Sequence, residues 1–225
     1  MPETSCNLSS CFLCKNCLPE WTDLVAVKKK TMLVNKGRKL FGEGEKVHGM
    51  YFVFSGVFKI AMRWDDEKEL ILRFAKPGDM LGHRGFGGDK LYPVSASAIT
   101  LSKVCFIDND FLQATLKTNI QFTNQMLHVY ADELHNAEKK MRDIAHRDVR
   151  GRIIQVLLEL SDSFGTDENN FIALPVTRQD IASYAGTTYE TVFKILSELT
   201  QSGIILSEGK KISIKDTHRL EKLLT

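Results

Sequence analysis

Residues 177–199 read TRQDIASYAGTTYETVFKILSEL and contain two short helical patterns on either side of a glycine turn. Thr177 with Asp180 gives an N-cap pattern for the first helix, and Thr187 with Glu190 gives a full capping-box signature for the second. The turn between them, YAGT, has the length used in helix-turn-helix units. The segment therefore predicts a helix-turn-helix.

The flanking segments extend this motif into a compact module. Residues 148–165, DVRGRIIQVLLELSDSFG, have a helical pattern. After the motif, two strand-like runs at 204–207 and 211–215 are joined by a turn at 208–210. We expect these two strands to form the wing of a winged helix-turn-helix.

Residues 39–107 have a different pattern, of short apolar runs separated by glycine turns. Phe58, Ile60 and Met62 alternate with less apolar residues, and Leu70, Leu72 and Phe74 repeat this alternation. Such a period of two is typical of half-buried antiparallel strands. Turns at 42–44, 55–56, 65–66 and 77–79 recur roughly every 8–12 residues, which favours a small β-roll.

After Asp110 the pattern is helical for about thirty-five residues without proline or glycine. Its apolar residues follow a heptad repeat, and the uncharged positions of this repeat include Ile120, Leu127, Tyr130, Leu134, Ala137, Met141 and Ile144. One interpretation is an amphipathic helix that packs on its own β-roll through Phe122, Met126 and Val129. Because there are two apolar stripes, we favour a helix that packs on the roll with one stripe and forms a parallel dimer seam with the other.

Composition limits the possible classes of protein. The 225 residues carry a net charge of only +2, and residues 146–225 hold 10 Lys+Arg against 11 Asp+Glu, so binding to nucleic acid would need a local patch. No apolar run has the length of a membrane span, which favours a soluble cytoplasmic protein. The sequence has no glycine-rich phosphate loop and no Ser-His-Asp pattern, so an enzyme is not expected.

Four of the five cysteines lie in residues 6–17, CNLSSCFLCKNC, with the spacing C-x4-C-x2-C-x2-C, and the fifth is Cys105. In a reducing compartment such a group favours metal binding or redox chemistry over disulfides. The spacing allows a 4Fe-4S cluster, a zinc site, or an arm without metal that acts as a thiol switch. We interpret His48 and His83 as surface or packing residues.

The order of β-roll, long helix and winged helix-turn-helix resembles the CRP/FNR family of bacterial transcription regulators, most specifically in 177–199 and in the glycine pattern of KGRKLFGEGEKVHGMYFVFSGVFKI. The resemblance implies an α+β fold with a cyclic-nucleotide-binding-like β-roll. It implies a cysteine-rich arm at 1–18, a sensor roll at 19–116, a dimerisation helix at 117–146 and a DNA-binding domain at 147–225. The expected partners are a second copy of the chain, a palindromic double-stranded DNA operator and RNA polymerase, with no membrane.

The resemblance also bears on the signal. In the cyclic-AMP branch a Glu and an Arg hold the nucleotide, whereas His83 and the region of Tyr92 and Pro93 stand at those positions here. A buried phosphate would lack its guanidinium partner, so cyclic AMP is not expected. The FNR branch instead implies a 4Fe-4S cluster, sensitive to oxygen or redox state, on Cys11, Cys14, Cys17 and Cys105, with Cys6 as a spare cysteine and alternative ligand.

By the same resemblance the second helix of 177–199 begins at Thr188 and presents Tyr189, Glu190 and Lys194 to the major groove. Thr177 and Arg178 are expected at the DNA backbone. Two alternatives remain open. One is the same regulator with a small-molecule effector in the roll and a zinc-bound or metal-free arm. The other, of a different class, is an iron–sulfur electron-transfer protein.

Overall fold

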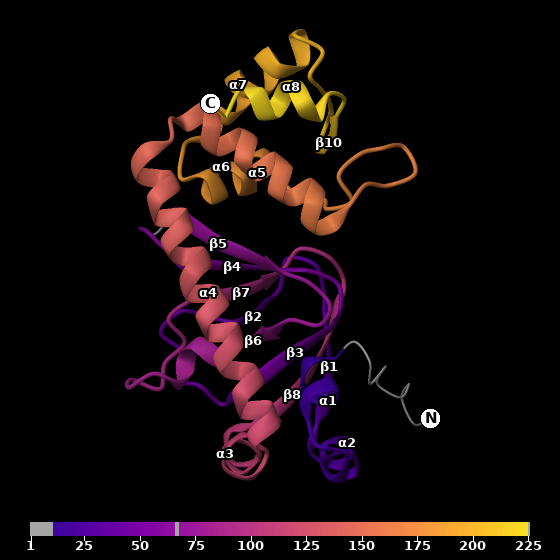
Figure 1. Ribbon diagram of the computed structural model, residues 1–225, viewed down its shortest axis with the longest axis vertical. Coiled ribbons are helices and arrows are strands. Elements are labelled where there is room, and N and C mark those ends of the chain that lie inside the picture. Colours follow the sequence, from indigo (N-terminus) through magenta and orange to yellow (C-terminus); the bar gives the residue numbers. More distant parts are fainter. Residues whose placement is uncertain (1–10, 66–67, 225) are drawn as a thin grey trace. The chain divides into compact units, whose positions relative to one another are not determined.

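The structure is a computed structural model that describes residues 11–65 and 68–224. The chain divides into two compact units (Figure 1). One comprises Met1–Asp66 with Leu72–His135, and the other comprises Glu67–Ile71 with Asn136–Thr225. The long helix α4 (Ile120–His146) passes from the first unit into the second.

The first unit contains the predicted β-roll, built from two four-stranded sheets with the orders β1-β8-β3-β6 and β2-β7-β4-β5. The strands are β1 (Lys30–Val34), β2 (Lys39–Phe41), β3 (Gly49–Ser55), β4 (Phe58–Arg63), β5 (Glu69–Ala75), β6 (Met80–Leu81), β7 (Ser95–Ala98) and β8 (Ser102–Asp108). The pairs β1–β8, β3–β8, β3–β6, β2–β7 and β4–β7 are antiparallel. The expected roll is thereby confirmed.

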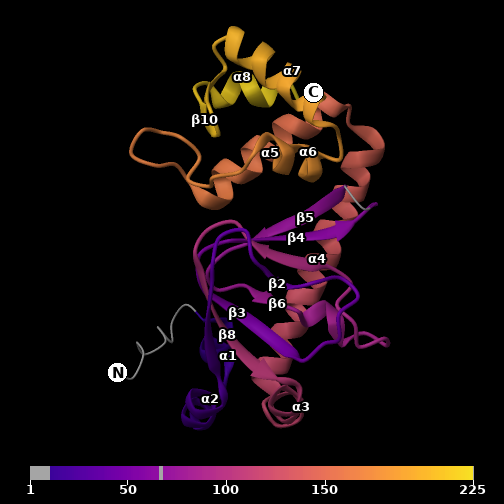
Figure 2. The same ribbon diagram turned by 180° about the vertical axis from the view of Figure 1, so that it is seen from behind.

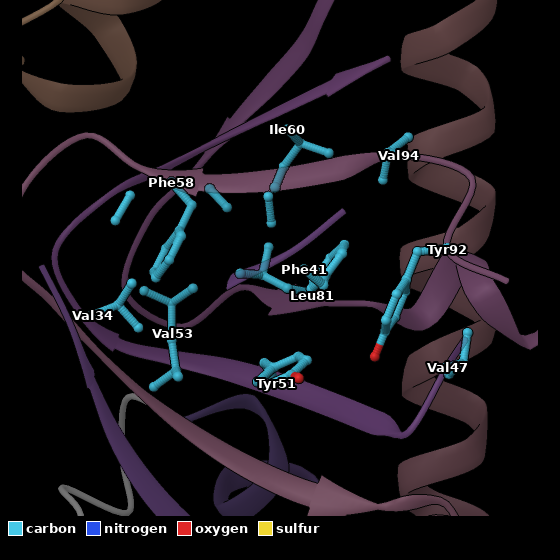
Figure 3. Packing of buried hydrophobic residues seen from close by; sticks show 14 residues of the cluster. Val34, Phe41, Val47, Tyr51, Val53, Phe58, Ile60, Leu81, Tyr92 and Val94 are labelled. Atoms are coloured by element: carbon cyan, nitrogen blue, oxygen red, sulfur yellow. The ribbon is translucent and has the colours of Figure 1, made fainter. Parts of the chain in front are cut away.

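Aromatic and branched side chains fill the roll (Figure 3). The ring of Phe41 stacks on that of Tyr92 with centroids 4.0 Å apart, and on that of Tyr51 at 5.7 Å. At the predicted turn after β3, Gly56 has φ +82°, and a Cβ there would collide with the side chain of Ser102. Glycine is therefore required at this turn.

The predicted alternation of β4 and β5 is followed only in part. Phe58 and Ile60 are buried, but Met62 near the end of β4 is 41% exposed. In β5 the fully buried residues are Ile71 and Ala75, which lie on the face opposite the expected Leu70, Leu72 and Phe74. Strand β5 is at the edge of its sheet, and Leu70, Leu72 and Phe74 on its other face are only partly buried.

Helices complete the first unit. They are α1 (Phe12–Asn16), a 3₁₀ turn (Pro19–Trp21), α2 (Thr22–Lys28), a second 3₁₀ turn (His83–Phe86), α3 (Asn109–Thr118) and the first part of α4. The single helix expected after Asp110 is in fact two, because Asn119 leaves helical geometry with φ −105° and ψ 82°. Its side-chain oxygen accepts a hydrogen bond from the backbone N–H of Phe122 at 3.1 Å and so starts α4.

Helix α4 has two apolar faces, as the sequence predicts. Phe122 and Met126 are buried in the core of the roll. Most of the predicted seam residues are exposed on the other face: Ile120, Leu127, Leu134, Ala137, Met141 and Ile144. Tyr130 differs, because its hydroxyl donates to the backbone oxygen of His83 at 2.6 Å and so contacts the roll of its own protomer.

The second unit contains the predicted winged helix-turn-helix (Figure 2). It consists of the end of α4 with α5 (Val149–Phe164), α6 (Arg178–Ala185), α7 (Tyr189–Gln201), β9 (Ile205–Glu208), β10 (Lys211–Ile214) and α8 (Thr217–Lys222). Strands β9 and β10 pair antiparallel and form the wing. Among the described residues, no helix is both long and apolar enough to cross a bilayer.

Candidate nucleic-acid interface and cysteine site

The start of α6 is fixed by a capping box. Thr177 Oγ1 accepts from the backbone N–H of Asp180 at 3.0 Å, and Asp180 Oδ2 accepts from the backbone N–H of Thr177 at 2.9 Å. The sequence predicts the N-cap here, and the structure shows that Asp completes the box in place of Glu. The side chain of Thr177 is therefore occupied in holding the helix that precedes the turn.

The turn and the start of α7 differ slightly from the prediction. Gly186 has φ +62° and ψ 52°, a left-handed conformation that glycine adopts without strain. Thr187 belongs to the turn, because its N–H donates to the Ala182 oxygen at 3.0 Å. Thr188 is the N-cap of α7. The expected capping box of Thr187 and Glu190 was wrong, so Glu190 is not needed as a cap.

Helix α7 separates its residues into a buried and an exposed face. Its buried residues are Val192, Ile195, Leu196 and Leu199. On the exposed face are the predicted reading residues Tyr189, Glu190 and Lys194. Phe193 is on the same face with 52% of its surface exposed, and sequence reasoning did not select it. The sequence does contain a sign of this exposure, because Phe193 is an apolar residue that does not fit the spacing of the buried residues 192, 195, 196 and 199.

Arg178 joins three elements at this face. Its guanidinium donates to the Gly209 oxygen at 2.9 Å and to Ser207 Oγ at 3.1 Å, both in the wing. The guanidinium carbon is also 5.8 Å from the centre of the Phe193 ring. Because these partners are neutral, the positive charge of Arg178 is not cancelled. It is therefore suited to attract a phosphate beside the exposed face of α7.

The cysteine site, defined as Cys11, Cys14, Cys17 and Cys105, lies in the first unit. Cys11 and Cys17 are the residues on either side of α1, and Cys14 lies within that helix. Cys105 lies in β8, opposite Thr31 of β1 and Phe52 of β3. The structure brings all four side chains into one apolar cluster. Cys6, the alternative ligand, is outside the described residues.

The chemistry of this donor set fits an iron–sulfur cluster, since Cys11, Cys17 and Cys105 belong to one apolar cluster and Cys14 packs against it. Burial, and then the nearby Cys11, raise the pKa of Cys17 to about 12, so binding must deprotonate this thiol. Within residues 11–65 and 68–224, no three His, Cys, Asp or Glu side chains converge as a single metal ion requires. Thiolates bound to separate iron atoms need not converge in this way.

A group of charged residues joins the roll to α4. Glu133 forms ion pairs with Arg73 at 3.1 Å, His83 at 3.0 Å and Arg84 at 2.9 Å. Burial alone would raise the pKa of Glu133, but the hydrogen bond from His83 and the charges of His83, Arg73 and Arg84 lower it to about 2. His83 is thus a buried packing residue, as expected, while His48 is exposed.

The hollow beside the charged residues Arg73, His83 and Arg84 is small. It is lined by residues that include Phe41, Arg73, His83, Arg84 and Tyr92, and its interior volume of about 10 Å³ matches a single water molecule. Tyr92 is 2% exposed and donates to the Gly49 oxygen at 3.1 Å. Its ring therefore occupies the interior of the roll, close to where the family resemblance implies an arginine (near Tyr92 or Pro93) in the cyclic-AMP branch.

Comparison with known proteins gives matches to both units. The Crp-like helix-turn-helix domain matches residues 151–223, and the cyclic nucleotide-binding domain matches residues 32–119. The chain is 32% identical over 189 residues to the CRP-like cAMP-activated global transcriptional regulator of Mycobacterium tuberculosis, covering 83% of this chain and 84% of that protein.

Two further relatives cover more of the chain. Identity to the transcriptional activator protein Anr of Pseudomonas aeruginosa is 28% over 229 residues, which covers 98% of this chain and 92% of that protein. The solved structure of FixK2 from Bradyrhizobium japonicum superposes with a TM-score of 0.76 at 26% identity, covering 88% of this chain and 98% of that one.

Proposed function

Because this chain belongs to the CRP/FNR family of DNA-binding transcription regulators, we propose that it binds a palindromic operator as a homodimer. We further propose that it senses oxygen or cellular redox state through a 4Fe-4S cluster on the cysteine site. The family consists of regulators and not of enzymes. The winged helix-turn-helix also removes the reason to consider an electron-transfer protein.

DNA binding is assigned to the exposed face of α7. Glu190 can accept a hydrogen bond from a cytosine amino group, and Lys194 can donate to guanine or to a phosphate. Arg178 is proposed to contact the DNA backbone from the start of α6. Thr177 and Thr188 are the N-caps of α6 and α7, and they are proposed to lie near the DNA backbone beside Arg178.

The homodimer is proposed to form through the exposed stripe of α4. Leu127, Leu134 and Met141 are each at least 60% exposed although apolar, and their spacing of seven is that of a coiled-coil seam. Two recognition helices related by the dimer axis would contact half-sites about 34–36 Å apart. RNA polymerase is proposed as the further protein partner, on the ground of family membership.

The observation that carries the sensing proposal is the position of Cys105. This cysteine is far in sequence from Cys11, Cys14 and Cys17, yet it is buried in the same cluster. A thiol arm that acts alone would not need a partner on β8. Three thiols of the arm and one of the roll supply the four ligands that such a cluster takes.

The arm is in contact with the dimerisation helix, which supplies a route for the signal. Phe12 of α1 stacks on Phe52 with ring centres 6.4 Å apart, and it meets the edge of Phe122 of α4 at 5.7 Å. A bound iron–sulfur cluster supplies a group that oxidants such as oxygen attack. The four cysteines would hold α1 against β8, and thereby keep Phe12 against the start of α4.

Cyclic AMP is not proposed as the effector. Tyr92 fills the interior of the roll, Arg73 is paired with Asp79 and Glu133, and Arg84 is paired with Glu133. A nucleotide phosphate would meet a carboxylate and would find no unpaired guanidinium in this group. An organic effector in the roll combined with zinc in the arm remains the alternative, and metal analysis distinguishes the two.

The test is a series of single Cys→Ser variants, purified without oxygen and assayed for iron, sulfide and visible absorption. Replacement of Cys11, Cys14, Cys17 or Cys105 should remove most of the bound iron, since a cubane needs four ligands. Cys6→Ser is the matched control and should keep it. A Cys105→Ser protein with a full cluster, or zinc in the unmutated protein, would contradict the proposal.

A further inference from the structure

The exposed face of α7 carries two aromatic rings beside its charged residues. Tyr189 is 43% exposed and Phe193 is 52% exposed. Their ring centres are 6.5 Å apart with an angle of 20° between the planes. Residues four apart lie on the same side of a helix, so the rings form a short apolar strip. Such a strip is costly in water unless a partner covers it.

Two side chains lie near the ring of Phe193. The ring of Tyr189 stacks with it, and the guanidinium carbon of Arg178, which belongs to α6, is 5.8 Å from its centre. Arg178 is itself fixed by the Gly209 oxygen at 2.9 Å and by Ser207 Oγ at 3.1 Å. A ring held in this way loses little freedom on binding, which favours a specific contact.

The major groove contains one apolar group, the C5-methyl of thymine. The other base edges there are hydrogen-bond donors and acceptors, and a phenyl ring against them would leave them unpaired at a cost. Glu190 and Lys194 are exposed beside the rings and can serve the polar edges. The apolar strip therefore complements a thymine that adjoins the bases read by these two charged residues.

Resting on the proposed DNA-binding function, we propose that Phe193 is a specificity-determining residue that contacts the C5-methyl group of a thymine in each half-site. Tyr189 and Arg178 are positioning residues that hold its ring. Removal of this methyl group from the DNA should therefore weaken binding about fourfold, as expected for the loss of one buried methyl-sized group.

The experiment uses the full-length dimer and a duplex obtained by binding-site selection. Each thymine of one half-site is replaced in turn by deoxyuridine, which keeps base pairing and removes only the methyl group. The dissociation constants of the thymine and uracil duplexes are then compared. For the unmutated protein we expect at least one position where uracil weakens binding about fourfold, and no effect elsewhere.

The same pairs of duplexes are then measured with three variants. Phe193→Ala should bind both duplexes with equal affinity, and Phe193→Leu should keep part of the preference for the methyl group. Lys194→Ala is the matched control, because it changes an exposed neighbour on the same helix. It should weaken binding to both duplexes alike and leave their ratio unchanged.

The outcomes separate this inference from the function on which it rests. If the unmutated protein selects no duplex, DNA binding itself fails. If it binds a duplex but tolerates uracil at every position, the assignment of Phe193 is wrong. It is equally wrong if Phe193→Ala retains the full preference for thymine, and the rings then have another partner, such as a protein or a second copy of the chain.

Discussion

Glu133 is a single carboxylate on α4 that pairs with Arg73, Arg84 and His83 of the roll. Its pKa of about 2 lies below the ordinary value of 4.5, despite burial that acts in the opposite direction. The charged form therefore stabilises the folded state above a pH of about 4.5. This contribution is lost as the pH falls towards 2.

From this shift we predict that Glu133→Gln lowers the free energy of unfolding by about 2–3 kcal/mol at pH 7. Near pH 2 the difference from the unmutated protein should be small, because Glu133 is then about half protonated in the folded state and most of its contribution is lost. Urea unfolding followed by tryptophan fluorescence at several pH values measures this. The control is Glu138→Gln, which makes the same substitution at an exposed position of the same helix. An equal loss at both pH values would show that the ion pairs are not its cause.

Single residues were predictable where the pattern is local. The N-cap at Thr177 and the glycine turn follow from the sequence, because capping depends on residues three apart. The cap at Thr188 in place of Thr187 depends on the exact end of the turn. Glu133 was not selected, because its partners Arg73 and Arg84 are far away in the sequence.

At the scale of the element, the exposed stripe of α4 leads to a prediction on association. Leu134 is 62% exposed and is placed in the proposed seam. Leu134→Glu would bring two like charges together across the dimer axis, at a cost on the order of several kcal/mol. Sedimentation should show a monomer at low micromolar concentration.

The control for that experiment is Gln125→Glu, which adds the same charge at an exposed position of α4 outside the heptad stripe. This variant should sediment as the unmutated protein does. If the Leu134→Glu protein remains dimeric, the seam has been placed on the wrong face of the helix.

Helices and strands were predictable from periodicity, but the residues at which they begin and end were less predictable. The heptad pattern identified α4, and the two apolar stripes correctly suggested one face for the roll, where Phe122 and Met126 are buried. The break at Asn119 was missed, since asparagine is tolerated within helices and becomes a cap only through a specific turn. Tyr130 was assigned to the seam because a repeat does not show where a hydroxyl finds its partner.

For the whole molecule, the order of domains was predictable while the pairing of strands was not. Antiparallel order in the roll joins strands distant in sequence, such as β1 with β8, and no local pattern specifies such pairs. Periodicity likewise did not predict that Cys105 lies with the cysteines of the arm, whereas the family resemblance implied it. The boundaries at 18, 116 and 146 stay a prediction.

The most direct test follows one sample of unmutated protein, purified without oxygen, during exposure to air. Iron content, visible absorption and the dissociation constant for a selected palindromic duplex are measured at each time. We expect iron at the start, and a change in DNA affinity of at least about tenfold, on the order of 1.4 kcal/mol, that parallels the loss of iron. Iron loss with unchanged DNA affinity, or a sample that contains zinc and no iron, would contradict the central claim.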